Sequence, residues 1–513
     1  MRQYKRMRSP RVCYIPINAA FSLPPVVAMP EWPCNRHGER HDITRAGFFL
    51  AAIFCSAISV TRWLFYDPRS VDPAGGFYHF YKDDGTIYDR ATRHLVSSTR
   101  FVFNNAMAWL QFKEPQYLER VKHGVAYIRD VHRNPQTGGY AWLLRDHQVV
   151  DATNHCYGLA FVVLAYSCAL KSGITEARAW IAETFDLMEQ HFWLPEHGVY
   201  GSEASADWVL TDYRGQNDNM HSCEAMLAAF EATGEQRYLE RASTLAKHFT
   251  IRQAGFTGGQ VWEHFNADWT PDLEYNKGDR TNIFRPWGFQ TGHQTEWAKL
   301  LLILDRHQPA GWHLDRAREL FDRAMEYGWD QKHGGLIYGY DLQGAAYDED
   351  KYFWVQAESF AAAALLFDRT KDGKYREWYD RIWAYSWQYF VDHQYGAWFR
   401  ILTPDNQKVD DEKIAGWQDR LPHHGRLLRS AQCDRLSSAK KNGAWHAAAH
   451  RFFMETFYCA FFHCAYTTSI SASKRALPAS SSQVAVMLLR ANCNTSCSLR
   501  SSALMQAIKL SFT

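Results

Sequence analysis

The sequence predicts an all-α protein with an (α/α)6 barrel fold, a closed ring of six helix hairpins. A glycine-centred aromatic turn recurs along the middle of the chain, and two amphipathic helical segments follow each turn. The second segments share a Tyr-Leu-Glu-Arg-like stretch, at 117–120, 238–241 and 375–378. Repeats of roughly 55–70 residues that each form a helix hairpin are typical of a solenoid or of its closed form. Six such turns favour closure into a ring.

The turns place the expected elements in order. They are P-A-G-G-F-Y at 73–78, T-G-G-Y-A-W at 137–142, H-G-V-Y at 197–200, G-G-Q-V-W at 258–262, H-G-G-L-I-Y at 333–338 and Y-G-A-W-F at 395–399. The clearest hairpin is 223–249, where apolar residues recur every three or four positions and Thr233-Gly234 interrupts them. The other first helices are expected to begin near Asn104, Phe161, Trp297 and Ser359.

In such a ring, the residues that begin the inner helices converge at one mouth of a central cavity. Polar and aromatic residues fall at or near each expected start: Arg100, Tyr157, His221, His293 and Glu358. The repeat alone therefore predicts where a site lies.

The two ends of the chain differ from its middle. We expect the barrel domain at 65–413, a separate extension at 1–64 that is disordered or forms a first helix, and an aberrant tail at 414–513 in place of the last helix. The tail has only three acidic residues, Asp419, Asp434 and Glu455. The apolar run 46–60 in the extension is short for a membrane span, so a buried helix is expected and a signal-anchor is left open.

The net charge and the positions of the cysteines limit which classes of partner and which cellular compartment are expected. The net charge is +2, so neither a nucleic-acid nor a membrane partner is expected. Only Cys156, Cys168 and Cys223 lie within 65–413, which indicates a reducing compartment, the cytoplasm, and no disulfide framework. Aromatic residues make up 15% of the chain, which suits a carbohydrate site as well as a large helical core. A homodimer is left open.

The most informative stretch is 284–302, F-R-P-W-G-F-Q-T-G-H-Q-T-E-W-A-K-L-L-L. His293 and Glu296 are three apart, so they share one face of a helix. Gly292 is expected to let the backbone turn sharply just before that face. A titratable base, a carboxylate and flat aromatic rings, together with Arg285, suit a sugar site. The simpler alternative is a helix start with a polar capping residue.

Two further segments carry candidate site residues. In 214–225, Asn217 and His221 are four apart and share a face, although a structural histidine is the alternative. In 351–360, three candidates precede an alanine-rich helix, for which a capping turn with a core tryptophan is the alternative: Trp354, Gln356 and Glu358. For Arg100 and Tyr157, a solvated arginine and a buried tyrosine are the alternatives.

No sequence motif indicates a metal or phosphate site. The chain contains no H-E-x-x-H, paired C-x-x-C or G-x-G-x-x-G pattern. Histidine is therefore the expected acid–base agent, because its unperturbed pKa lies near neutrality.

Between Phe65 and Lys413 the chain resembles the N-acylglucosamine 2-epimerase family, above all its aldose–ketose isomerase branch of mannose and sulfoquinovose isomerases. The segments that carry the resemblance are D-Y-R-G-Q-N-D-N-M-H-S-C-E-A at 212–225, E-H-F-N-A-D-W at 263–269 and F-R-P-W-G-F-Q-T-G-H-Q-T-E-W-A-K-L-L at 284–301. The resemblance implies an (α/α)6 barrel, a monosaccharide substrate, and neither a redox cofactor nor a metal.

The resemblance also implies a mechanism through a cis-enediolate. A base removes the C2 proton of the opened aldose, and reprotonation at C1 gives the ketose, or at C2 the epimer. His293 would be one of two proton-transfer histidines, and His221 would assist ring opening with Glu296 nearby. The implied substrate contacts are Arg100, Tyr157, Asn217, Arg285, Trp354, Gln356 and Glu358. The F-R-P-W-G-F-Q variant favours a neutral hexose such as mannose.

The family's second proton-transfer histidine lies in a late motif that this chain lacks. After D-D-E-K at 410–413 the chain reads I-A-G-W-Q-D-R-L-P-H-H-G-R-L-L-R-S-A. One codon choice for residues 414–431, read from its second base, spells S-P-A-G-K-T-D-Y-H-T-M-G-A-C-Y-E-V, which is similar to the family motif. We therefore expect a single-base frame error, a mis-called splice or a mutation at the Ile414 codon.

Other functions remain open at this stage. They are a sugar-binding pseudoenzyme, because a histidine is lost; an N-acylglucosamine 2-epimerase; and a glycoside hydrolase. The hydrolase needs two opposed carboxylates, whereas histidines dominate the expected mouth.

Overall fold

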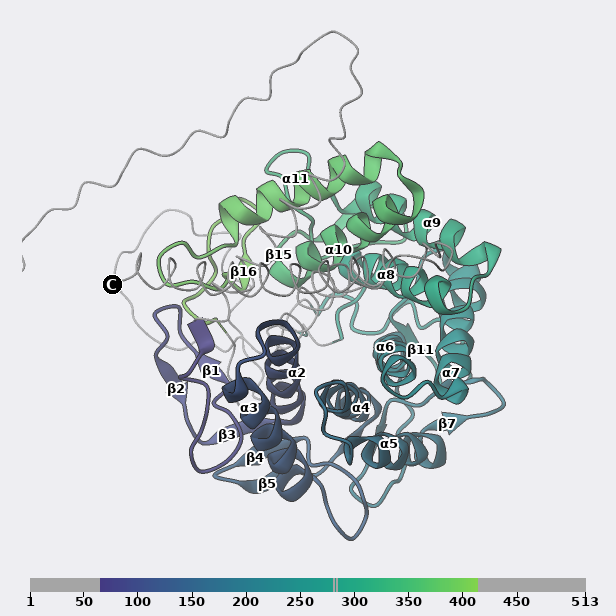
Figure 1. Cartoon of the computed structure of the whole chain (residues 1–513). Helices are drawn as coiled ribbons and strands as arrows, with labels where there is room; N and C mark the ends of the chain where they lie inside the picture. Colours follow the sequence, from purple (N-terminus) through teal and green to yellow (C-terminus); the bar gives the residue numbers. More distant parts are fainter. Residues whose placement is uncertain (1–64, 280–281, 283–284, 414–513) are drawn as a thin grey trace, which may run out of the picture. The chain divides into compact units, whose positions relative to one another are not determined.

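The computed structural model describes residues 65–279, 282 and 285–413 of the chain. The predicted extension 1–64 and tail 414–513 lie outside these residues. Ten α-helices in the described part form five consecutive hairpins arranged as a ring (Figure 1). They are α2 (Leu95–Phe112), α3 (Pro115–Tyr127), α4 (Cys156–Lys171), α5 (Ala177–His191), α6 (Gln216–Thr233), α7 (Gln236–Lys247), α8 (Thr291–His307), α9 (Gly311–Gly328), α10 (Phe353–Thr370) and α11 (Gly373–Tyr389).

The even-numbered helices line the inside of the ring and the odd-numbered helices cover them (Figure 1). Sequence explains this division. The inner helix α4 is C-Y-G-L-A-F-V-V-L-A-Y-S-C-A-L-K and is buried nearly all round, whereas the outer helix α7 buries one face, through Tyr238, Leu239, Ala242, Leu245 and Ala246. The fold is the predicted (α/α)6 barrel, with five of its six hairpins among the described residues.

Every inner helix begins five to nine residues before its predicted start. The first turns of these helices hold buried polar side chains, such as Gln216 and His221 in α6, which interrupt the apolar periodicity. The predicted starts mark only the point where continuous apolar sequence begins. Several of the predicted site residues therefore lie inside the helices rather than before them.

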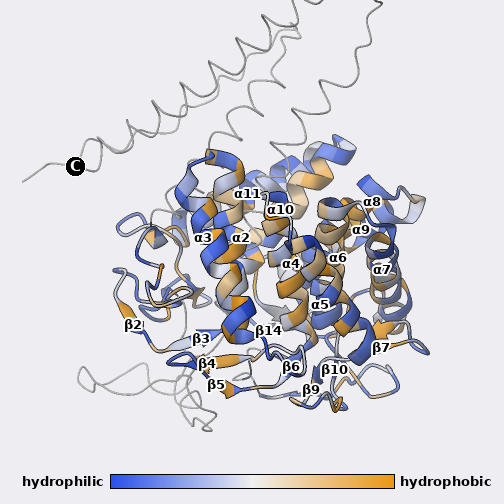
Figure 2. Cartoon of the chain, turned by 60° about the horizontal axis from the view of Figure 1, so that its bottom comes forward, coloured by the Kyte–Doolittle hydropathy of each residue, from blue (hydrophilic) through white to orange (hydrophobic). Residues whose placement is uncertain are grey.

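Short strands gather at one end of the barrel, at the bottom of Figure 2. An all-α description misses them because most are only two residues long. They are β1 (Phe80–Tyr81), β2 (Ile87–Asp89), β3 (Thr92–His94), β4 (Leu143–Arg145), β5 (Gln148–Asp151), β6 (Asn154–His155), β7 (Trp193–Leu194), β8 (Val199–Tyr200), β9 (Glu203–Ala204), β10 (Arg214–Gly215), β11 (His264–Phe265), β12 (Phe289–Gln290), β13 (Gly339–Tyr340), β14 (Ala346–Asp348), β15 (Lys351–Tyr352) and β16 (Ile401–Leu402).

The strands tie consecutive hairpins together. A strand directly precedes each inner helix and pairs antiparallel with a strand that follows the next glycine turn: β3 with β4, β6 with β9, β10 with β11, β12 with β13, and β15 with β16. The same pairing recurs around the ring, so it fixes where each inner helix starts.

A side-chain amide reinforces three of these junctions. Asn219, Gln294 and Gln356 are each the fourth residue of an inner helix. Their amides donate to and accept from the backbone of one turn residue: Asn219 with Tyr200 at 2.9 and 2.8 Å, Gln294 with Val261 at 2.8 and 2.9 Å, and Gln356 with Leu336 at 2.8 and 2.9 Å. We call these three residues the amide clamps.

The chain between β16 and Lys413 returns to β1 and the turn that follows it. Asp83 N donates to Asp411 O at 2.7 Å, and Lys413 N donates to Tyr81 O at 2.8 Å. The ammonium of Lys413 also lies 2.6 Å from Asp392 and 3.1 Å from Asp83. At the end of the barrel that carries the strands, residues 411–413 are therefore bonded to residues near the start of the described part of the chain.

The expectation for Gly292 is wrong. It is the second residue of α8, and its backbone does not adopt a positive φ. A Cβ at this position would lie 2.2 Å from Cζ3 of Trp354. Glycine is needed here for close packing of α8 against α10, not for a turn.

Candidate active site

The sixth residue of every inner helix in the described part of the ring belongs to one buried layer. These five residues are Arg100, Phe161, His221, Glu296 and Glu358, each at most 3% exposed. The Arg100 guanidinium lies 4.8 Å from the Phe161 ring centre, and that ring lies 5.0 Å from the His221 ring. We call these five residues the sixth-position layer.

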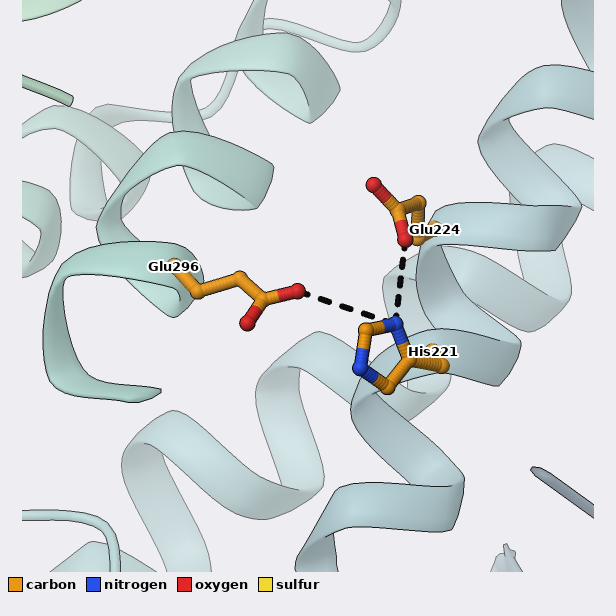
Figure 3. A group of neighbouring side chains, drawn as sticks. All are labelled: His221, Glu224 and Glu296. Carbon is orange, nitrogen blue, oxygen red and sulfur yellow. Dashed lines mark hydrogen bonds and ion pairs between the residues drawn. The ribbon is translucent and has the colours of Figure 1, made fainter. Parts of the chain in front are cut away.

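His221 is held between two carboxylates (Figure 3). Its Nδ1 lies 3.0 Å from Oε2 of Glu224, one helical turn further along α6, and 3.6 Å from Oε1 of Glu296 on α8. The Tyr157 ring packs edge-on against the imidazole at 5.0 Å. The orientation of the imidazole is therefore fixed by α4, α6 and α8 together.

A buried lysine adjoins this group. Lys299, one turn beyond Glu296 on α8, places Nζ 2.7 Å from Oε2 of Glu358 and 3.6 Å from Oε1 of Glu224. Three carboxylates thus converge on one ammonium and one imidazole.

The carboxylates differ in proton affinity. For Glu224, burial favours the neutral acid, but Lys299 and the hydrogen bond to His221 outweigh it and lower the pKa to about 2. For Glu296, burial dominates, and the nearby charge of Glu358 adds to it, so the pKa is raised despite the attraction of His221. Glu296 therefore keeps a proton more readily than Glu224.

His293 forms a second pair, with Glu263. Its Nδ1 lies 2.7 Å from Oε1 of Glu263, which directly precedes β11, and both side chains are buried. Gln216 donates to Oε2 of Glu263 at 3.1 Å and accepts from Trp297 Nε1 at 2.8 Å. The positive charge available on His293 lowers the pKa of Glu263 although burial opposes it. Glu263 is thus a carboxylate suited to hold Nδ1–H.

Most of the predicted site residues lie in or beside these two groups. Arg100, His221, Glu296 and Glu358 belong to the sixth-position layer, and Tyr157 contacts His221. Trp354 packs against the His293 ring at 5.2 Å.

Three predicted residues lie differently. Arg285 is in the loop before β12, where it pairs with Glu203, lies 3.6 Å over the Tyr213 ring and donates to Tyr275. Asn217 is half-buried at the second position of α6. Gln356 is an amide clamp, and its donor and acceptor are both used by the backbone of Leu336. Their roles as sugar contacts stay predictions.

Sequence reasoning missed Glu263, Lys299 and Phe161. Glu263 lies inside the segment 263–269 that carries the family resemblance, but no repeat spacing links it to His293. Lys299 follows Glu296 by three residues and directly precedes the apolar run 300–304, a signal that this lysine needed a buried partner. Aligning the repeats on their strand pairs would have put Phe161 in the same position as Arg100 and His221.

Three of these groups could also hold a metal ion. His221, Glu224 and Glu296 offer ligand atoms that lie within 4.8 Å of one another. The charge of Lys299 already compensates Glu224. The expectation that no metal is required stays a prediction.

None of the helices in the described ranges combines the length and the apolar character needed to cross a bilayer.

The known proteins that are similar to this chain include sugar isomerases and sugar epimerases. The chain is 54% identical over 351 residues to D-mannose isomerase from Marinomonas mediterranea, covering 68% of this chain and 89% of that protein. It is 22% identical to cellobiose 2-epimerase from Ruminococcus albus, over 71% of this chain and 93% of that protein. A crystal structure of D-mannose isomerase superposes with a TM-score of 0.72 at 47% identity, covering 80% of this chain and 98% of that chain.

Residues 75–423 match the sequence profile of N-acylglucosamine 2-epimerase (GlcNAc 2-epimerase). This match spans more than half of the chain and includes both histidine–carboxylate groups. The chain belongs to the N-acylglucosamine 2-epimerase family.

Proposed function

We propose that this protein is an aldose–ketose isomerase that converts a neutral hexose, D-mannose, to its ketose by histidine acid–base catalysis. The observation that carries the proposal is the pair of buried histidines, each oriented through Nδ1 by a carboxylate. The isomerase relative at 54% identity supports the substrate class.

His293 is assigned the proton transfer at carbon. Its Nδ1–H donates to Glu263, which fixes the tautomer in which Nε2 carries the lone pair. Nε2 takes the C2 proton, the C2–H electron pair forms the C1–C2 double bond, and O1 becomes the enediolate oxygen. The hydroxyl proton of O2 passes to O1, and return of the carbon-bound proton to C1 as C2=O forms then gives the ketose. Glu263 stabilises the imidazolium that exists between the two steps.

Ring opening is assigned to His221 and Glu296. Opening a pyranose requires a proton to leave the anomeric hydroxyl and a proton to reach the ring oxygen. His221, held by Glu224, is placed as the base, and Glu296, with its raised pKa, as the acid. The distance of 3.6 Å between Nδ1 of His221 and Oε1 of Glu296 supports a joint action of the two side chains on one hemiacetal.

The remaining predicted residues are assigned to binding and charge stabilisation. Arg100, which lies in the sixth-position layer against Phe161, is assigned the stabilisation of an enediolate oxygen. Trp354 and Tyr157 offer flat faces to the sugar beside His293 and His221. Arg285, Asn217, Gln356 and Glu358 complete the proposed set.

We place the reaction in the cytoplasm, because Cys156, Cys168 and Cys223 are buried free thiols that need no oxidising compartment. The monosaccharide is the proposed partner, and no nucleic acid is proposed.

The test of substrate and reaction type is product analysis. Purified protein is incubated separately with mannose, glucose, an N-acylglucosamine and a nitrophenyl mannoside, and the products are separated by chromatography. Fructose from mannose supports the proposal. N-acylmannosamine would instead indicate a 2-epimerase, and released nitrophenol a hydrolase. Binding of mannose without any product would indicate a pseudoenzyme.

We expect weak turnover by the protein with the printed sequence, which includes residues 414–513. Under the frame-error hypothesis, residues 414–513 replace the late family motif that carries the second proton-transfer histidine. A barrel without its closing helix would expose apolar surface worth about 25 cal/mol per Å². Turnover equal to that of a full-length relative would contradict this expectation.

A further inference from the structure

One lysine lies among the three buried carboxylates of the site. Lys299 is fully buried, with Nζ 2.7 Å from Glu358 and 3.6 Å from Glu224. Burial of an ammonium is costly unless ionised partners balance its charge. Lys299 therefore favours the carboxylate form of both partners.

Glu296 is placed differently from those two. Its partner is His221 Nδ1 at 3.6 Å, and neither of its oxygens makes a hydrogen bond within the described residues. Glu224, in contrast, accepts from His221 at 3.0 Å and is also near Lys299. The carboxyl group that least needs to be ionised is therefore Glu296, which faces His221 from the neighbouring inner helix α8.

We propose that Lys299 is a positioning residue of the isomerase: by holding Glu224 and Glu358 as carboxylates, it leaves Glu296 as the group that carries the transferable proton. The inference rests on the proposed function and adds a residue to it. No covalent step is assigned to Lys299.

The charges around the group are consistent with this assignment. The ionisable groups that face it come from all five inner helices: Arg100 from α2, Tyr157 from α4, His221 and Glu224 from α6, Glu296 and Lys299 from α8, and Glu358 from α10. Two fixed cations face three carboxyl groups, so a single proton neutralises the whole set. Without Lys299 a second proton would be needed, and it would bind Glu224 or Glu358.

The test uses Lys299→Met, Lys299→Arg and the double variant Lys299→Met with Glu358→Gln in the full chain. The rate of deuterium exchange at C2 of mannose is measured by NMR against pD, because exchange remains detectable when net turnover is slow. In Lys299→Met we expect the exchange rate at neutral pD to be at least about tenfold lower. We also expect the acidic and the basic limb of the rate–pD profile to lie about one pD unit higher, since every remaining carboxyl binds its proton more tightly. Lys299→Arg keeps the limbs of wild type. The double variant, which removes one charge of each sign, returns them towards wild type.

Thermal unfolding supplies a readout that needs no turnover. The melting temperature of Lys299→Met should fall furthest below wild type near pH 8 and approach it as pH drops to about 5, because the uncompensated carboxylates then become protonated. The double variant should lose this pH dependence. Lys171→Met is the matched control: it removes a lysine 2.8 Å from Glu231, outside the site, and should leave the exchange profile unshifted.

Two results would overturn the proposal. One is a loss of exchange rate in Lys299→Met that is equal at every pD, together with a fall in melting temperature that is equal at every pH. The other is a double variant that behaves like the single one. If wild type itself shows no exchange, the proposed function fails, and the melting data still decide whether Lys299 sets the charges of the cluster.

Discussion

At the level of single residues, the two proposed acid–base histidines are oriented by different means. His293 relies on one carboxylate, Glu263, at 2.7 Å, whereas His221 lies between Glu224 and Glu296. A single strong partner suits a group that must keep one tautomer through a proton transfer. A shared position suits a group that works together with a neighbouring acid.

Glu263→Gln should therefore impair chemistry without impairing binding. The amide still accepts the Nδ1–H bond but does not stabilise the imidazolium, so we expect C2 exchange to fall by about 100-fold. Mannose affinity, measured by calorimetry, should change less than about threefold, since the Glu263 carboxylate is directed to His293. Equal losses in affinity and exchange would show that Glu263 acts on binding instead.

Asp218 gives a pH-dependent prediction. It is buried in the first turn of α6, and burial raises its pKa to about 6 despite a hydrogen bond from Ser202. Because the folded state binds the proton more tightly than the unfolded chain, stability is full below pH 4 and falls as pH rises through about 6. Asp218→Asn should match wild type near pH 4 and be more stable by about 3 kcal/mol at pH 8. Urea unfolding at both pH values measures this, and destabilisation at pH 8 would contradict it.

Some site residues could be predicted from sequence and others could not. His221, His293 and Glu296 stand in compact polar segments just before apolar runs, so local composition marked them. Glu263 and Lys299 act through partners on other repeats, at separations of 30 residues or more, and no local pattern records such a contact.

At the level of elements, the amide clamps explain why an amide residue occupies the fourth position of the three inner helices α6, α8 and α10. Gln356 was predicted to bind sugar, yet its amide bonds the backbone of Leu336 in both directions. We expect Gln356→Leu to leave a buried N–H and C=O unpaired and to lower the free energy of unfolding by about 2–4 kcal/mol. Chemical denaturation measures this loss. An unchanged stability with a raised KM would favour the sugar-binding role.

Gly292 provides a second test at this scale. In Gly292→Ala the new methyl group overlaps the Trp354 ring, which also packs on His293. Overpacking of this kind costs about 1–3 kcal/mol, and we expect exchange activity to fall with it because Trp354 must move. Gly311→Ala is the control, since nothing lies within 4 Å of its Cβ at the start of α9. The idea is wrong if both variants melt at the wild-type temperature.

Hairpin order was predictable because each glycine turn and its two helices are local in sequence. The strands were not, because a two-residue strand such as β10 shows no alternation and exists only through its partner β11. The helix starts were predicted too late in the sequence for a related reason: the site itself puts polar residues into the buried first turns of the inner helices.

At the level of the whole molecule, the barrel makes one layer of the site from one residue of each of the five inner helices in the described part of the chain. A ring assembled this way gathers groups that are far apart in sequence, from Arg100 to Glu358. It also means that the loss of one helix removes one member of the site. The predicted replacement of the late motif after Lys413 would matter for this reason, although that segment lies outside the described residues.

Deuterium exchange with mannose tests the central claim, that the buried histidine–carboxylate groups move a proton on an aldose. The chain as written and a chain with the frame restored at the Ile414 codon are incubated with mannose in heavy water and followed by NMR. We predict deuterium at C2 of recovered mannose and at C1 of fructose, slowly with the first chain and faster with the second, and neither with His293→Ala. Binding of mannose by both chains with no deuterium in either sugar would contradict the account.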